Sequence, residues 1–154
     1  MGYRSDIRIV TSKKGFDKLK EYVSDYLKKE KKDDSYNLLN DFTVYKENKY
    51  QVYFGWNYLK WYEGSYADVD AIMSGLDKLA ENDYSYRYAR LGEEYDDYEE
   101  QYHESDNEEE QDIEYPNMIR EFDDDYVIEN LNAQERIEER EAEISTWKFL
   151  VMQD

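Results

Sequence analysis

The chain has 154 residues and carries 39 acidic against 20 basic side chains, a formal net charge of −19 at pH 7. This length fits one domain with a buried core of its own. The absence of cysteine excludes disulfides and thiolate chemistry, and no run approaches the roughly 18 apolar residues of a membrane span. Arg4, Asp6 and Arg8 interrupt the apolar N-terminus, which is untypical of a signal peptide, so we expect a cytoplasmic protein.

The charge is distributed very unevenly. Residues 1–90 hold 16 basic and 15 acidic side chains, a net of +1, whereas residues 91–154 hold 4 and 24, a net of −20. Residues 91–129 alone have 18 acids and one base, Arg120. Such a charge asymmetry gives information about the binding partners of a protein and not about its fold. We expect the acidic half to repel nucleic acid and anionic membranes and to attract a basic surface, less strongly as salt is added.

The first elements follow from the periodicity of the apolar residues. Residues 3–11 alternate and predict a half-buried strand, and residues 13–31 show helical spacing with Ser12 as a plausible cap. Residues 42–46 suggest a short strand. Residues 50–62 form the clearest strand, whose aromatic face must be core or interface and would suit a homodimer.

The later elements are less uniform. Asp68 begins a second amphipathic helix that ends at Asn82, and residues 84–91 alternate as another strand. Residues 95–104 fit a helix or a strand. We favour a strand that pairs back on 84–91, because a hairpin turn precedes it. The C-terminal residues 127–151 have Ile137, Ile144 and Val151 at heptad spacing and predict a helix, with a late strand at its end as the alternative.

This order predicts an α+β fold, the ferredoxin-like βαββαβ antiparallel sheet backed by two helices. An acidic extra strand or hairpin and a C-terminal helix would be added to it. We expect a single domain over residues 1–154, with a near-neutral α+β core at 1–90, an acidic extension at 91–129 and a C-terminal helix at 130–154.

The sequence offers little catalytic chemistry. His103 is the single histidine and there is no cysteine, so a zinc site is not expected. The phosphate-binding and nucleophile motifs are absent. The adjacent acids 123–125 could hold Ca²⁺ or Mg²⁺ weakly, but a helix cap is favoured. We therefore expect no catalytic residue, no metal and no cofactor, and an enzyme that uses carboxylates and a metal is kept as a further alternative.

The acidic half is rich in tyrosine, unlike a disordered acidic tail. Tyrosine is favoured in protein interfaces. Two neighbouring acidic strands, or a strand and a helix, would place two rows of carboxylates at a density like that of DNA phosphates. Such a surface could occupy a nucleic-acid channel, with tyrosines packed on its walls. The predicted partner-binding residues are Glu93, Glu94, Tyr95, Asp96, Asp97, Tyr98, Glu99, Glu100, Tyr102, Glu104, Asp106, Glu108, Glu109, Glu110 and Asp112.

Three blocks of the sequence carry a resemblance. The opening M-G-Y-R-S-D-I-R-I, the Y-x-V-Y-F-G-W block at 50–56 and the R-L-G-E-E-Y-D-D-Y-E-E block at 90–100 resemble small acidic proteins of tailed phages and prophages. The resemblance covers about the first 130 residues and brings no catalytic residue. It implies a phage gene, and small acidic phage proteins are often inhibitors of host defence, of the anti-CRISPR or anti-restriction type.

Three functions are therefore weighed. The first is an inhibitor that binds the nucleic-acid channel of a host defence nuclease as an acidic mimic. The alternative is a phage accessory protein that binds a partner other than a nuclease, and the further alternative is the carboxylate enzyme. The expected partner is a basic, nucleic-acid-binding protein such as a Cas or restriction nuclease. We expect no direct contact with nucleic acid or membrane.

Overall fold

Antiparallel strands form one sheet of five in the part of the chain that the structure describes. The structure is a computed structural model that describes residues 2–30, 36–110, 112–118 and 121–152, with side chains up to Ile144 in the last range. The order across the sheet is β2-β3-β1-β4-β5, and all neighbours are antiparallel. The strands are β1 (Ser5–Ser12), β2 (Val44–Glu47), β3 (Gln51–Leu59), β4 (Tyr86–Leu91) and β5 (Tyr98–His103). The α+β class is confirmed, and five strands replace the four of a ferredoxin-like sheet.

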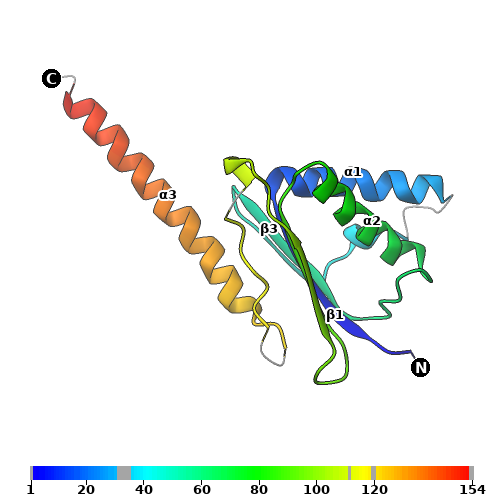
Figure 1. Cartoon of the computed structure of the whole chain (residues 1–154). Helices are drawn as coiled ribbons and strands as arrows, with labels where there is room; N and C mark the ends of the chain where they lie inside the picture. Colours follow the sequence, from blue (N-terminus) through cyan, green and yellow to red (C-terminus); the bar gives the residue numbers. More distant parts are fainter. Residues whose placement is uncertain (1, 31–35, 111, 119–120, 153–154) are drawn as a thin grey trace.

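Helices cover one face of this sheet and leave the other to the C-terminal half. Figure 1 shows α1 and α2 side by side on one face, while α3 lies on the opposite side and runs away from the body. Short 3-10 turns, η2 (Leu38–Asn40) and η3 (Glu108–Glu110), lie between the longer elements. The helices are α1 (Lys13–Lys29), α2 (Ala67–Glu81) and α3 (Asp124–Met152).

The main core lies between the sheet and the two covering helices. The apolar stripe predicted for the first helix is buried, and Ser12 caps that helix by accepting a hydrogen bond of 2.9 Å from the Gly15 N–H, as expected. Phe54 and Trp56 of β3 face the same layer and lie edge to face, with ring centroids 5.9 Å apart. Burial of these side chains supplies the main driving force for folding.

β1 is buried on both faces, which corrects the prediction of a half-buried strand. It lies between β3 and β4, and the segment that leads into α3 covers the face we expected to be exposed. Arg8 on that face is 2% exposed. Polar and apolar residues do alternate along β1. The layer that covers Arg8 comes from residues more than 100 positions away, however, and local periodicity does not predict such a layer.

β3 is an interior strand, so its aromatic face is core and not a dimer surface. Phe54 pairs with Ile9 of β1 on one side and with Tyr45 of β2 on the other. Tyr53, on the opposite face of β3, is fully buried with Val10. The strand predicted at 50–62 is β3 over 51–59, and within this chain it pairs with β1 along its length and with β2 from Val52 to Gly55.

Candidate partner-binding site

A tight hairpin joins β4 to β5 and carries part of the predicted acidic surface. The Gly92 N–H donates to the Asp97 carbonyl at 2.8 Å, and the Asp97 N–H donates to the Glu94 carbonyl at 3.1 Å. A Cβ on Gly92 would lie 2.1 Å from Asp97 Oδ2 and 2.3 Å from Tyr3 Oη. A side chain at this position would therefore displace the Asp97 carboxylate and the Tyr3 hydroxyl. The strand favoured for 95–104 is confirmed as β5 over 98–103.

The Asp97 carboxylate ties this hairpin to the sheet and to the N-terminus. Arg90 binds it with both terminal nitrogens, at 2.7 and 3.1 Å, and the Tyr3 hydroxyl donates to it at 2.6 Å. The hydrogen bonds from Arg90 and then Tyr3 lower the pKa of Asp97 to about 2. The same contact raises the pKa of Tyr3. Asp97 therefore holds the fold together and is not free to meet a partner.

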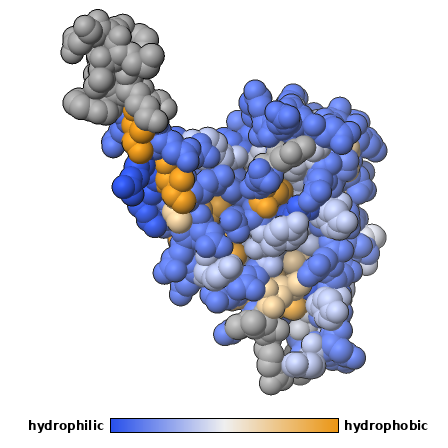
Figure 2. Space-filling view, turned by 60° about the vertical axis from the view of Figure 1, so that its left-hand side comes forward, coloured by the Kyte–Doolittle hydropathy of each residue, from blue (hydrophilic) through white to orange (hydrophobic). Residues whose placement is uncertain are grey.

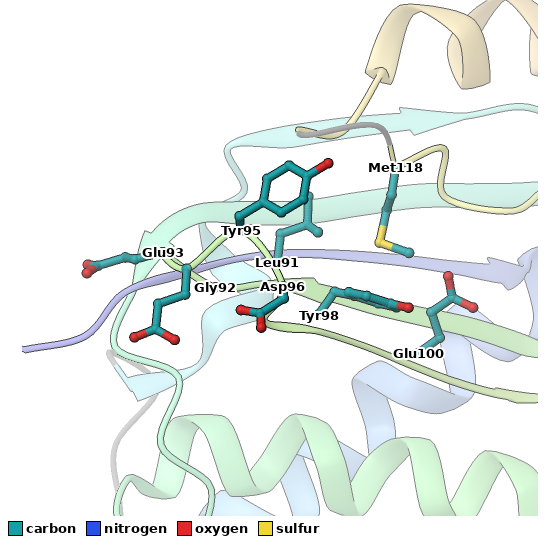
Figure 3. A pocket seen from close by; sticks show the side chains of 9 residues that line it. Leu91, Gly92, Glu93, Tyr95, Asp96, Tyr98, Glu100 and Met118 are labelled. Carbon is teal, nitrogen blue, oxygen red and sulfur yellow. The ribbon is translucent and has the colours of Figure 1, made fainter.

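A groove of about 500 Å³ lies against the hairpin. Figure 3 shows carboxylate side chains, two tyrosines and the Met118 thioether around it, with Tyr98 and Glu100 side by side on β5. Tyr95 is 78% and Tyr98 63% exposed. The lining residues are Leu91, Gly92, Glu93, Glu94, Tyr95, Asp96, Tyr98, Glu100 and Met118, of which six belong to the predicted set.

This groove has the chemistry of a cation receptor. Carboxylates pair with ammonium and guanidinium groups, and tyrosine rings attract the same cations through their faces. Sequence reasoning found the acids and tyrosines of the hairpin but missed Leu91 and Met118. Met118 lies in an irregular segment after Pro116, where no periodicity indicates what it packs against.

A second group of predicted acids, between Glu104 and Asp112, follows β5 at its other end. Two hydrogen-bonded acids position the chain there. The Asp83 carboxylate is hydrogen-bonded to His103 Nε2 at 2.9 Å and to Ser105 Oγ at 3.0 Å. Both hydrogen bonds lower the pKa of Asp83, and the one with His103 has the larger effect. The pair fixes the chain where it leaves the sheet. Glu110 is only 3% exposed and accepts the Ser85 N–H at 3.3 Å, so it too serves the fold rather than a partner.

The predicted anchor Tyr102 packs on a buried arginine. The Arg87 guanidinium carbon lies 5.1 Å from the Tyr102 ring centroid and 4.2 Å from that of Tyr115. Arg87 also forms an ion pair with Glu104. The arginine thereby orients one predicted tyrosine and one predicted acid, and it adds Tyr115, which is 62% exposed, to the aromatic surface.

The fifteen predicted contact residues divide clearly by exposure. Asp97 is half-buried and Glu110 buried, while the other thirteen are exposed. They do not form two rows of carboxylates on neighbouring strands, because β4 beside β5 contributes Arg87 and Arg90. The exposed acids gather instead at the hairpin and the start of β5, and in the segment after β5. The expected geometry is corrected accordingly to two acidic groups that bracket one edge strand.

No group of three or more His, Cys, Asp or Glu side chains is placed to hold a metal ion within the described residues. Asp123 accepts the Tyr126 N–H at 3.1 Å and caps α3, as favoured from the sequence, while Asp124 pairs with Arg8. No helix in the described ranges has the length and apolar character needed to cross a membrane.

Comparisons with models of protein families, with curated proteins and with solved structures each found no match.

Proposed function

We propose that this protein is a phage-encoded inhibitor of a host defence nuclease, of the anti-CRISPR or anti-restriction type. It would act as an acidic mimic in the nucleic-acid channel of its target. The observation that carries the proposal is the exposed acid held on a folded hairpin, anchored through Asp97 by Arg90 and Tyr3. Carboxylates in fixed positions meet a lysine- and arginine-lined channel without the ordering cost that a flexible acidic tail incurs.

The arrangement also supports a specific shape for the surface of the target. The two acidic groups lie at opposite ends of the six-residue β5, and at roughly 3.3 Å per residue they are about 20 Å apart. A channel that fits would present two basic clusters at that spacing. Tyr98 and Tyr102 lie between the groups on one face of β5, where they would pack on the channel wall. Arginines of the target would enter the groove beside Tyr95.

The test compares two variants with the same change in net charge. The first neutralises six exposed acids of the two groups and keeps Asp97 and Glu110. The control neutralises six exposed acids on α1 and α2 or at their C-terminal ends. Purified Cas and restriction nucleases are assayed for binding to duplex DNA with each protein added. The first variant carries Gln or Asn at Glu93, Glu94, Asp96, Glu100, Glu108 and Glu109, and the control at Asp17, Glu21, Asp25, Glu30, Asp77 and Glu81.

The expected result is that the native protein and the control variant displace DNA from a nuclease at low salt and lose effect as salt rises, while the first variant does not compete. Equal loss of competition in both variants would show that net charge, and not the placed acids, is responsible. Binding of a nuclease that never displaces DNA would contradict the mimic.

A second candidate function follows from β5, which is an edge strand of the sheet among the described residues. In antiparallel pairs, hydrogen-bonded and non-hydrogen-bonded positions alternate. The Gly92–Asp97 bond sets this alternation, so the backbone groups of Tyr98, Glu100 and Tyr102 point outward. An extended basic segment of a phage or host protein could add to this edge, which fits an accessory interaction module. Such a partner would bind without being displaced by DNA.

The ferredoxin-like topology and the origin in a phage gene are part of the same proposal. β1-α1-β2-β3-α2-β4 has two strand–helix–strand halves with β1 and β3 at the centre, which supports a ferredoxin-like unit extended by β5. The resemblance of the opening residues to phage proteins supports a phage or prophage gene and the cytoplasm of a bacterial host cell.

A further inference from the structure

Among the described side chains, α3 contacts the rest of the chain along its first half. Val127 and Leu131 are fully buried, and the Leu131 carbonyl accepts the Asn48 Nδ2–H at 2.9 Å. Two turns further on, Lys49 reaches Glu139 at 3.5 Å. Figure 1 shows that the helix then runs away from the body toward the C-terminus. A projecting helical segment of this length is marginal in water unless it is packed against something.

From Ile137 onward, α3 carries an apolar stripe that the sheet does not cover. Ile137 is 57% and Ile144 46% exposed, and they are seven residues apart. Tyr126, which lies on the same side of the helix, is 54% exposed although its neighbour Val127 is buried, so the sheet leaves this side open. Figure 2 shows apolar surface along this helix. A seven-residue repeat is the pattern of a coiled-coil seam.

The charges beside the stripe are self-complementary. With Ile137 and Ile144 at the first core position of the heptad, Arg136 precedes the seam and Glu141 follows it on the other side. In a parallel pair these two flanking positions face each other across the seam, so Arg136 of one copy meets Glu141 of the other. Arg140 occupies the second core position, where its aliphatic stem can cover the seam while its guanidinium reaches outward.

We propose that α3 pairs with α3 of a second copy in a parallel coiled coil along the stripe of Ile137 and Ile144. A second copy is favoured because Arg136 and Arg140 lie at or beside the stripe together with Glu141 and Glu143, whereas the acids Glu135, Glu138 and Glu139 lie on other sides of the helix. Two basic and two acidic side chains make this part of the seam formally neutral in a very acidic chain. This inference rests on α3 alone and is independent of the proposed target.

Sedimentation equilibrium of the full chain, from about 1 to 100 µM, tests the pairing. We expect twice the 18.8 kDa chain mass, and stronger association at higher salt because two chains of net charge −19 repel each other. The double variant Ile137→Ser/Ile144→Ser should be monomeric. Tyr95→Ser removes a comparably exposed apolar side chain from the body and should stay dimeric. A monomeric native protein over this range, at low and high salt, would overturn the proposal.

Charge variants decide the matter if the serine variant loses helix content by circular dichroism. Arg136→Glu should weaken the dimer about tenfold, and Arg136→Glu/Glu141→Arg should restore it. A native dimer that neither the serine nor the charge variants weaken would overturn the proposal, because the seam would then lie elsewhere. Failure of the second charge variant to restore association would exclude the parallel arrangement.

Discussion

Arg8 in the centre of the sheet binds Asp124 in the first turn of α3, and this pair joins the near-neutral half of the chain to the acidic half. Arg8 Nε lies 2.9 Å from Asp124 Oδ1, and Nη2 lies 3.1 Å from Oδ2. The Tyr53 hydroxyl donates to the same carboxylate at 2.5 Å. Burial opposes ionisation of Asp124, but the hydrogen bonds from Arg8 and Tyr53 outweigh it and lower the pKa. Burial and the neighbouring carboxylate together raise the pKa of Tyr53.

Asp124→Asn should lower the free energy of unfolding by about 3–5 kcal/mol, because it leaves the buried Arg8 guanidinium without its counter-charge. Asp125→Asn is the matched control. Asp125 is the exposed neighbour in the same helical turn, and its substitution should change stability by less than about 0.5 kcal/mol. Urea unfolding monitored by tryptophan fluorescence measures both. Equal stabilities of the two variants would show that the pair does not hold α3 to the sheet.

The Asp97 pair gives a pH dependence of known sign. Its folded-state pKa of about 2 lies below the usual 3.8, so it stabilises the fold above pH 4 and loses this contribution as the pH falls toward 2. Asp97→Asn should cost about 1–3 kcal/mol at pH 7, and its difference from the native protein should shrink between pH 4 and pH 2. The exposed Asp96→Asn is the control. A difference that does not change with pH would contradict this assignment.

Amide exchange should alternate along β5. The Gly92–Asp97 hydrogen bond places every second pair of the β4–β5 ladder in the hydrogen-bonded class. Exchange measured by NMR should therefore be slow at one set of amides and fast at the next. Uniformly fast exchange would mean that the acidic segment is not folded in solution, which would also remove the basis of the proposed function. The slow set is Glu99, Gln101 and His103, and the fast set is Tyr98, Glu100 and Tyr102.

Gly55 on β3 accepts no side chain, because a Cβ there would lie 1.9 Å from the Ile7 carbonyl oxygen of β1. Gly55→Ala should lower the free energy of unfolding by about 1–3 kcal/mol through a forced shift of the central strands. Gly64, at φ +84° with open space around it, is the contrasting position. Gly64→Asn should be nearly neutral, because asparagine tolerates this conformation. Thermal unfolding compares the two, and a stable Gly55→Ala protein would contradict the close β1–β3 approach.

Local sequence patterns were sufficient to predict an element where the burial of one of its faces determines the structure. The apolar spacing of Phe16, Leu19 and Val23 predicted α1, and the turn before Tyr98 correctly favoured a strand. The same reasoning failed for Arg8, because strand alternation reports two faces but not what covers the second one. It also treated Glu110 like its exposed neighbours, although Glu110 alone of that run turns inward to the Ser85 amide.

The sequence by itself determined the α+β class, the elements that periodicity marks and the concentration of negative charge after residue 90, since these depend on neighbours along the chain. Only the tertiary structure decided which acids are exposed, that they lie at the two ends of β5 and that Met118 completes the groove. Those properties depend on contacts between residues far apart in the chain, such as Tyr3 with Asp97, and no local pattern records them.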